Sequence, residues 1–401
     1  MPLALYIHIP WCVKKCPYCD FNSHGLRAPM PEAGYVTALL ADLDGDLADF
    51  RAALAGRAIT SVFFGGGTPS LFKPASIKAI LEGARTRLPF ADDCEITLET
   101  NPGTAEHGKF EGYLAAGVNR ISFGVQSFDD DKLGALGRIH SAAEAEAAIK
   151  LARDAGYANI NLDLMYALPH QSLKGALADI EHAIALAPTH ISHYQLTLEP
   201  GTPFAKRPPP LPDDDAAWDM QEACQARLAE AGYAQYEVSA YAQAGRRCRH
   251  NLNYWRFGDY LGIGAGAHGK LTGNAGRGTE GAPATPLSVH RRWKSRSPIA
   301  YLQGAGTPQR IAGEEVVAAA QLPFEFMLNA LRLNDGVALD LFRARTGLSA
   351  AAIDGPLQEA RANGWLTDAA ERLGPTPLGR RFLNNLIEAF LPPTQPGHHH
   401  A

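Results

Sequence analysis

The chain has 401 residues, with Lys+Arg 37 against Asp+Glu 42, so its formal net charge is -5. Hydrophobic residues make up 46% and charged residues 20%, which excludes a disordered chain, a collagen-like fibre and a small disulfide scaffold. Because a mildly acidic chain has no overall attraction for nucleic acid or for an anionic membrane, we expect no nucleic-acid partner. Local peripheral contact with a membrane stays open.

The sequence contains no apolar run of the length that spans a membrane, and residues 1–10 lack the positive start of a signal peptide. We therefore expect no transmembrane helix and a cytoplasmic, reducing location. The six cysteines are then better interpreted as thiols or metal ligands than as disulfides. Cys94 and Cys224 stand alone in the sequence and are expected to be buried. The terminal His398, His399 and His400 carry no site prediction.

Short β-branched or aromatic runs alternate with helical patterns along the first part of the chain. We expect strands at residues 3–9, 59–64, 95–99, 120–125, 159–165 and 190–198. We expect helices at residues 34–53, 74–88, 105–116, 142–155, 173–186 and 216–231. This alternation predicts a parallel sheet with right-handed connections. Six units are too few for a closed barrel, so the expected fold class is α/β, a partial, open six-unit (β/α) TIM-type barrel. A doubly wound sheet is the alternative.

The second part of the chain is less regular. Residues 282–286 and 297–308 are interrupted by glycine and proline, and residues 314–391 predict a mainly helical, winged-helix-like module with a turn-rich stretch at 366–377. We divide the chain into a barrel (1–240), an extension (241–310) and a C-terminal domain (311–395). A winged helix often binds DNA, but the acidic balance and the scattered Arg380 and Arg381 favour packing against the barrel mouth.

The strongest chemical signal is a group of three cysteines, Cys12, Cys16 and Cys19, directly after the first strand. In a barrel this loop lies at the C-terminal face of the strands, where active sites form. Three thiolates at this spacing can hold three corners of a [4Fe–4S] cluster and leave one iron open. The alternative is a structural zinc ion with His8 or His24 as the fourth ligand.

Polar residues also follow or end several other predicted strands. Gly66 and Gly67 belong to a glycine run after the second strand, where backbone N–H groups can meet a carboxylate or phosphate. Four further polar residues stand at or near the third, fourth and fifth strands, namely Glu99, Gln126, Arg138 and Asp163. Each alone could simply fix a loop. Their repetition from strand to strand predicts a binding site at one end of the barrel.

The three cysteines, with Tyr18 before the last one, resemble the radical S-adenosylmethionine superfamily. Tyr-Ile-His-Ile-Pro at 6–10, Gly-Gly-Gly-Thr-Pro at 65–69, Gly-Val-Gln-Ser-Phe at 124–128 and Asp-Leu-Met-Tyr-Ala-Leu-Pro at 163–169 resemble its oxygen-independent coproporphyrinogen III oxidase group. The resemblance covers nearly the whole chain. The oxidase has a fourth cysteine where this chain has Phe21. The heme-chaperone branch of the group has a phenylalanine at this position, two residues after the third cysteine. It also has a His-Asn-x-x-Tyr-Trp motif, found here at 250–255. The chain therefore resembles the heme-chaperone branch more than the oxidase.

The resemblance implies cofactors and their contacts. The three cysteines would hold a [4Fe–4S] cluster whose open iron binds the amino and carboxylate groups of S-adenosylmethionine. The residues implied to line the S-adenosylmethionine site are Tyr6, Gly66, Gly67, Glu99, Gln126, Arg138 and Asp163. These roles are chemically sensible, because a carboxylate accepts from ribose hydroxyls and an arginine pairs with a carboxylate. No catalytic residue is assigned.

The resemblance further implies a heme chaperone that binds heme and passes it to an acceptor apoprotein. The alternative is an oxidase that decarboxylates propionates by radical chemistry. His250 is the candidate heme ligand, since a neutral imidazole is a usual axial ligand, and Cys248 is a possible thiolate ligand. The arginines that could pair with heme propionates are Arg246, Arg247, Arg249 and Arg256. Otherwise His250 belongs to a packed, hydrogen-bonded corner. Glycines in residues 258–269 could permit close approach of a ligand.

Overall fold

The structure, a computed structural model, describes residues 1–103, 108–273 and 287–392. Six parallel strands form the centre of one sheet, and they lie side by side in chain order. They are β1 (Leu3–Ile9), β4 (Ile59–Gly66), β5 (Phe90–Thr100), β6 (Arg120–Gln126), β7 (Ile160–Tyr166) and β8 (His190–Gln195). Nearly every position of β1, β6 and β7 is buried, as expected for strands covered on both faces.

Helices connect these strands, as the sequence predicts. They are α1 (Glu32–Asp49), α2 (Arg51–Leu54), α3 (Pro74–Arg85), α4 (Phe110–Ala115), α5 (Asp130–Ala135), α6 (Ala142–Asp154), α7 (Leu173–Ala185), α8 (Pro203–Lys206) and α9 (Asp214–Glu230). The predicted helix 105–116 is shorter in the structure, and its residues 105–107 lie outside the described part. Local sequence sets the starts: Ser141 and Glu144 form a capping box at α6, and Asp213 caps α9.

The chain then returns to the same sheet and extends both of its sides. β9 (Ala234–Glu237) and β10 (Ala240–Ala242) pair antiparallel beyond β8. On the other side, β11 (Asp259–Ile263) pairs parallel with β1, and β12 (His268–Gly273), β13 (Ser288–Lys294) and β14 (Ile311–Val316) continue antiparallel. β11 is a seventh parallel strand that the sequence analysis did not predict. It follows α10 (Arg249–Trp255), and α11 (Pro298–Gly304) precedes β14.

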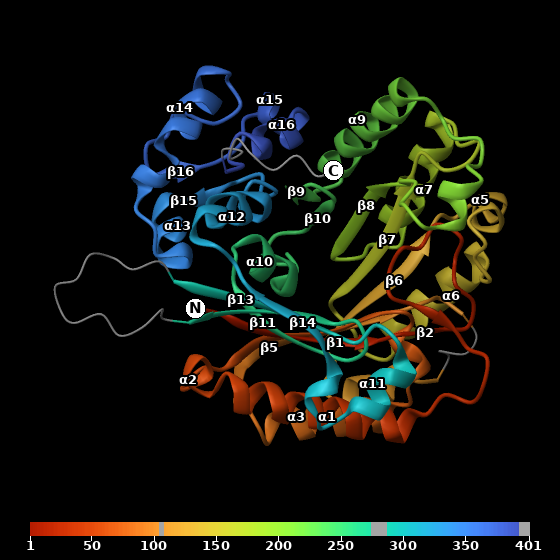
Figure 1. Ribbon diagram of the computed structural model, residues 1–401. Helices are drawn as coiled ribbons and strands as arrows, with labels where there is room; N and C mark the ends of the chain where they lie inside the picture. Colours follow the sequence, from red (N-terminus) through yellow and green to blue (C-terminus); the bar gives the residue numbers. More distant parts are fainter. Residues whose placement is uncertain (104–107, 274–286, 393–401) are drawn as a thin grey trace.

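The twelve strands run in the order β14-β13-β12-β11-β1-β4-β5-β6-β7-β8-β10-β9. Figure 1 shows α1, α3 and α11 on one face of the curved sheet and α10 on the opposite face. Within the described ranges, no pairing joins β14 to β9, so the barrel is open. The predicted fold class, a partial barrel with a helical C-terminal region, is confirmed.

The C-terminal region has its own apolar cluster, which includes Phe326, Phe342 and Leu386 and continues to Tyr236 of β9. Its elements are α12 (Leu322–Ala330), β15 (Val337–Ala338), α13 (Leu339–Thr346), α14 (Asp354–Ala362), β16 (Arg372–Leu373), α15 (Pro377–Arg381) and α16 (Leu383–Glu388). β15 and β16 form a small antiparallel ladder beside these helices, as in a winged helix. The exact division of the chain at 240 and 310 stays a prediction, and residues 393–395 of the third range lie outside the described part.

A buried ionic network ties α1 to the strands of the extension. Lys294 Nζ lies 2.6 Å from Asp42 Oδ1 and 2.7 Å from Asp46 Oδ1. Arg310 Nε lies 2.9 Å from Asp42 Oδ1, and Tyr301 donates a hydrogen bond to Asp42 Oδ2 at 2.7 Å. Since each buried charge has an opposite partner, the network fixes the extension against the barrel instead of destabilising the core. None of the described helices is long and apolar enough to cross a membrane.

Candidate functional site

The three cysteines lie on one loop at the carboxyl end of β1, where the sequence analysis places them. Cys12 closes the short strand β2 (Trp11–Cys12), which pairs with β3 (His24–Gly25). All three thiols are free and half-buried. The pKa of the Cys12 thiol is raised, and burial is the largest cause. Hydrogen bonds from Thr68 and Ser23 lower this pKa, and the neighbouring Cys19 and Cys16 raise it. The three sulfurs are therefore within electrostatic reach of one another.

The geometry separates the two metal hypotheses. Among residues 1–103, 108–273 and 287–392, no group of three or more histidine, cysteine, aspartate or glutamate side chains is gathered closely enough for a single metal ion. A cubane cluster spaces its thiolates more widely, because each thiolate binds a different iron. His8, one candidate fourth zinc ligand, has both ring nitrogens within hydrogen-bonding distance of other groups of the protein. In these contacts His8 is not available as the fourth ligand of a zinc ion.

The glycine run at the end of β4 forms a close-fitting cradle beside this loop. A Cβ atom at Gly67 would lie 2.5 Å from the carbonyl oxygen of Trp11, and one at Gly66 would lie 2.5 Å from the His8 ring. Gly66 also has a φ of 113°, which side chains rarely adopt. The cradle is therefore closed to any larger residue. It places the Gly66 N–H 3.2 Å from Glu99 Oε2, its hydrogen-bond acceptor.

Tyr6 and His8 point to this end of the barrel from β1. His8 Nε2 lies 2.9 Å from the carbonyl oxygen of Asn22, which can only accept, so Nε2 carries the proton and Nδ1 is free to accept. The Tyr6 hydroxyl then donates to Nδ1 at 3.0 Å. Burial lowers the pKa of His8 to about 4, so its ring is neutral near pH 7. The pair is an uncharged wall of the site.

Two half-buried carboxylates, Glu99 on β5 and Asp163 on β7, face the same interior. Burial raises the pKa of Glu99 to about 8, and the nearby charge of Asp163 adds to that rise. Burial also raises the pKa of Asp163, against hydrogen bonds from Asn161, Ser192 and Ser122 that favour its ionised form. Glu99 accepts a hydrogen bond from the Gly66 N–H, and its remaining acceptor sites suit ligand hydroxyl or ammonium groups, as the ribose and the methionine amine would provide.

Gln126 and Arg138 complete the set. Gln126 ends β6 with a φ of 74°, unusual for a residue with a side chain, and its Oε1 accepts a hydrogen bond from Tyr194 at 2.7 Å. Arg138 donates to Asn101 Oδ1 at 2.7 Å and to the carbonyl of Gly124, and its Nη1 lies 3.6 Å from Cys16 Sγ. Its buried Nε has no hydrogen-bond partner. A cavity of about 210 Å³ opens between Cys16, Asn101 and Arg138.

The site thus brings together the residues predicted to bind the cluster and S-adenosylmethionine: the cysteines follow β1, Arg138 follows α5, and the others lie on or just after β1, β4, β5, β6 and β7. The residues present fit those groups. Three free thiols share one loop, the glycine cradle leaves no room for a side chain beside that loop, and the Nε of Arg138 is buried without a partner among the described residues. The individual roles of these residues stay predictions.

His250 lies apart from the cysteine loop, inside the barrel beneath Tyr6. Its Nδ1 is 3.1 Å from the Ser61 hydroxyl, and its Nε2 is 3.0 Å from the Tyr254 hydroxyl. The ring is buried and stacks on Phe63 with centroids 5.0 Å apart, and burial lowers its pKa to about 3. Both ring nitrogens are thus engaged by the protein. This is the packed, hydrogen-bonded corner that the sequence analysis kept as the alternative.

Two of the four arginines proposed around His250, and the Cys248 thiol, already contact other groups of the protein. Arg247 pairs with Asp335 and Arg249 with Asp93, each at 2.8 Å. The buried Cys248 thiol lies 3.6 Å from Glu95 Oε1, and burial raises its pKa to about 12, which disfavours a thiolate.

Several residues of the site were missed by the sequence analysis. Ser122 on β6 lies opposite Asn161 on β7, Ser192 on β8 lies opposite Asp163 on β7, and these side chains bond to one another or to Asp163. Tyr194 holds Gln126. The signal that could have found them is strand alternation: polar residues that recur at every second position of a buried strand face the same interior as the known site residues.

Comparisons with known proteins agree with this geometry. Residues 6–183 match the radical SAM superfamily, and residues 317–382 match the HemN C-terminal domain. Over 390 residues the chain is 50% identical to the heme chaperone HemW of Haemophilus influenzae and 51% identical to the heme chaperone HemW of Escherichia coli. Each alignment covers 97% of this chain and 98% of the relative.

A solved structure shares the whole fold. Coproporphyrinogen III oxidase (HemN) from Escherichia coli superposes with a TM-score of 0.79, covering 97% of this chain and 90% of that one at 22% identity, which shows likeness of fold. Full-length identity of this extent, together with the cysteine loop and the glycine cradle, shows that the chain belongs to the HemW family within the radical SAM superfamily.

Proposed function

We propose that the chain is a heme chaperone, which binds heme and passes it to an acceptor apoprotein. The observation that carries the proposal is the identity of 50% and 51% over 97% of the chain with two proteins named heme chaperone. Phe21 supports it. This side chain, 65% exposed at the end of the cysteine loop, stands where the oxidase group has a fourth cysteine, so the chain lacks that thiol.

Membership of the radical SAM superfamily implies a [4Fe–4S] cluster and S-adenosylmethionine as cofactors. When bound, these cofactors would supply one-electron reduction of the sulfonium. In our proposal Cys12, Cys16 and Cys19 hold the cluster, and the Arg138 guanidinium, 3.6 Å from Cys16 Sγ, balances part of its negative charge. The cradle at Gly66 and Gly67 lets the methionine end of the cofactor lie close to the backbone, since neither position has a side chain.

The remaining residues orient the adenosyl part. Glu99 and Asp163 accept hydrogen bonds from ligand hydroxyl or ammonium groups, and Gln126 is held in place by Tyr194. Tyr6, bonded to the neutral His8, closes the interior wall and excludes water on that side. Each of these groups binds or positions. The chain's role in heme transfer does not require any of them to form a covalent bond.

The assignment of His250 as heme ligand stays a prediction, and in its present hydrogen bonds neither nitrogen is open to iron. A heme-acceptor apoprotein is the proposed partner, and the cytoplasm is the proposed location.

Heme titration of the purified full chain tests the function. We expect a Soret band, retention of about one heme per chain after gel filtration, and transfer of that heme to apomyoglobin added as a generic acceptor. Failure to retain heme would refute the proposal. In parallel, the anaerobically reconstituted protein is incubated with coproporphyrinogen III, and release of carbon dioxide above that of a Cys16→Ala variant would favour the oxidase instead.

A further inference from the structure

An open groove of about 980 Å³ lies on the outer side of the cysteine loop. One wall consists of the loop itself, at Lys14 and Lys15, together with residues 23–31. The opposite wall is the start of α11, at Ile299 and Leu302. Lys14 also lines the smaller cavity beside Cys16, so a single turn of chain separates the groove from the cluster site. Nothing in the proposed cluster or S-adenosylmethionine site uses this groove.

The lining of the groove has an unusual charge balance. Its charged side chains, Lys14, Lys15 and Arg27, are all positive and exposed, and none of the described residues that line it is an aspartate or glutamate. The whole chain, by contrast, carries a net charge of -5. A concave surface with one sign of charge attracts ligands of the opposite sign and strengthens their binding. The expected ligand is therefore an anion.

The rest of the lining is apolar. Leu26 and Met30 form part of one wall and Leu302 part of the other, and Ile299 is 69% exposed. An isoleucine this exposed beside other apolar side chains marks a surface that binds something. A ligand that packs against the apolar walls and also pairs with the cations has an apolar body and more than one carboxylate at its edge.

The groove also contains one histidine. His24 lies on β3, where its backbone N–H donates to the carbonyl of Pro10 at 2.7 Å, and this bond anchors it beside the cysteine loop. Its Nε2 is buried and has no hydrogen-bond partner in the described part of the chain, while a backbone hydrogen bond with Arg296 holds the ring, so the ring must rotate to present Nε2 to a ligand. His250 differs on this point, because both of its nitrogens are bonded. An imidazole nitrogen without a partner can bind the iron of a porphyrin after a small rotation of the ring.

We propose that this groove is a heme-docking site, with Lys14, Lys15 and Arg27 pairing with the propionates and His24 facing the iron. The proposal rests on the proposed function, because it takes heme as the cargo of the chain. A flat, apolar dianion matches the walls and the cations together. Docking here places the heme at the surface, where an acceptor protein can reach it, and one loop away from the cluster.

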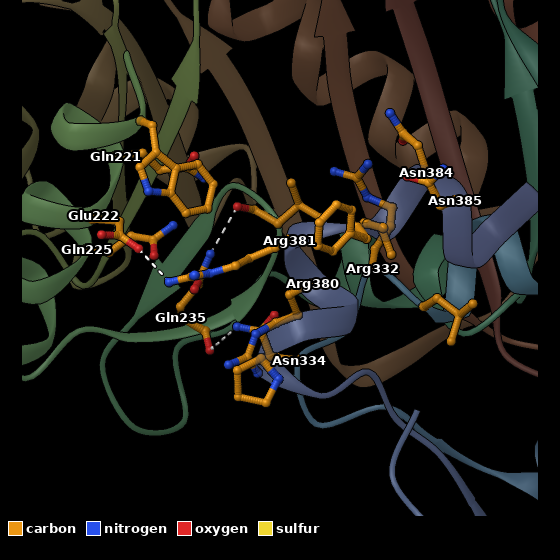
Figure 2. Close-up of a pocket in the computed structure, with 16 residues that line it drawn as sticks. Gln221, Glu222, Gln225, Gln235, Arg332, Asn334, Arg380, Arg381, Asn384 and Asn385 are labelled. Carbon is orange, nitrogen blue, oxygen red and sulfur yellow. Dashed lines mark hydrogen bonds and ion pairs between the residues drawn. The ribbon is translucent and has the colours of Figure 1, made fainter. Parts of the chain in front are cut away.

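Another groove on the molecule fits heme less well. A cavity of about 480 Å³ lies between α9, β9 and the helices α15 and α16, and Figure 2 shows side chains that line it. Its Arg381 pairs with Glu222 at 2.8 Å, and Arg332 pairs with Glu237 at 3.2 Å, so two of its cations are already neutralised. The labelled side chains in Figure 2 are mostly amides and arginines, which suit a polar ligand. The groove beside the cysteine loop has apolar walls, and among the described residues none of its three cations pairs with a carboxylate, although Lys15 donates to the Phe21 carbonyl at 2.9 Å.

The test measures the dissociation constant of ferric heme for the full chain by absorbance titration. The main variant is Arg27→Glu combined with Ile299→Asp, since both residues lie away from the cysteines and are exposed. We expect a dissociation constant raised about tenfold or more. Lys174→Glu, an exposed lysine on α7, is the matched control and should bind as the wild type does. Thermal melting and the cluster absorbance check that each variant is folded.

A second probe isolates the propionates. Heme dimethyl ester has the same iron and ring but no carboxylates, so we expect it to bind the wild type more weakly than heme. The single variant Arg27→Glu, which changes only charge, should weaken the binding of heme and leave the binding of the dimethyl ester unchanged. His24→Ala should shift the Soret maximum of bound ferric heme and leave the binding of metal-free protoporphyrin unchanged. If His24 were merely structural, the variant would instead weaken the binding of both porphyrins.

The outcomes separate this inference from the proposed function. If the wild type retains no heme, the chaperone function itself fails. A second outcome concerns a wild type that does bind heme. If the double variant Arg27→Glu, Ile299→Asp then binds heme equally well, while His250→Ala abolishes binding, the groove is refuted as the heme site. The chaperone function is unaffected by that result. Loss of sedimentation with phosphatidylglycerol vesicles in the groove variant, with heme binding intact, would assign the groove to lipid and also overturn the proposal.

Discussion

The carboxyl group of Glu99 makes the affinity for S-adenosylmethionine depend on pH in a predictable direction. Burial raises its pKa to about 8, and the charge of Asp163 raises it further, against the Gly66 N–H and the charge of Arg120, which lower it. Near pH 7 the ligand-free carboxyl is therefore mostly protonated. Hydroxyl or ammonium groups of the cofactor bind the ionised form, so binding must release this proton.

The sign and size follow from that proton. A ligand that selects the ionised carboxylate loses affinity as the pH falls below the pKa of the free protein. With a pKa of about 8, roughly nine tenths of the carboxyl is ionised at about pH 9 and roughly one tenth at about pH 7. We therefore expect the affinity to fall about tenfold between these two pH values, with nearly one proton released per cofactor bound at about pH 7.

Isothermal titration calorimetry in buffers of different ionisation enthalpy measures both the affinity and the proton release. Because the amino group of the cofactor titrates in the same range, the quantity that counts is the difference between the wild type and Glu99→Gln. The glutamine is neutral and of the same size, so its profile should lack the carboxyl contribution. Burial holds the pKa of His8 at about 4 and that of His250 at about 3, so neither ring titrates here.

Asp163 provides the second arm of the experiment. Its negative charge raises the pKa of Glu99, so Asp163→Asn should move the midpoint of the profile to lower pH. Because the two carboxyl groups interact, the midpoint of the wild-type pH profile is a property of the pair. Comparing the Glu99→Gln and Asp163→Asn variants shows how much each carboxyl contributes to it. Parallel profiles for the wild type and Glu99→Gln would refute the reasoning, as would a wild-type affinity that increases on acidification.

Three further predictions concern the cluster, the cradle and the ionic network. Cys16→Ala should lose the brown absorbance and the bound iron and sulfide after anaerobic reconstitution, whereas Cys224→Ala, in the core, should keep them. Gly67→Ala should weaken cluster retention because its Cβ would meet the Trp11 carbonyl at 2.5 Å, next to Cys12, whereas Gly134→Ala, which meets nothing within 4 Å, should retain iron normally. Asp42→Asn should destabilise the fold by about 3–5 kcal/mol in urea unfolding, because it leaves Lys294 and Arg310 short of a buried partner. Asp44→Asn, at an exposed pair with Arg87, should cost at most about 1 kcal/mol, and equal losses for the two aspartates would contradict the role of the network.

The central strands could be predicted from the sequence because each is a short apolar run between helical patterns. A strand buried on both faces, such as β6, needs apolar residues at nearly every position, and this pattern is local. The position of the site followed from the same reasoning. Parallel strands bring their carboxyl ends to one edge, so Cys12, Gly66 and Glu99 had to lie together once the strands were known.

β11 could not be predicted in this way. Its pairing with β1 joins Leu3 to Asp259 and depends on contacts between distant parts of the chain. The glycines around β11 were interpreted as space for a ligand, but they provide space for the chain itself. A Cβ at Gly264 would lie 2.3 Å from the His8 carbonyl oxygen, and one at Gly262 would meet the carbonyl of His268. A glycine indicates that another group approaches the backbone closely, but the sequence does not show whether that group is a ligand or another part of the chain.

His250 illustrates the same limit for a functional residue. Its motif places an imidazole beside two aromatic residues, a combination that suits a heme site and a packed core equally. The deciding facts are the positions of the Ser61 and Tyr254 hydroxyls, which engage its two nitrogens, and Ser61 lies on β4, far away in the sequence. Whether an imidazole can bind a metal depends on what its nitrogens already contact. By that criterion His24, whose Nε2 has no partner, is better placed than His250 to meet an incoming iron.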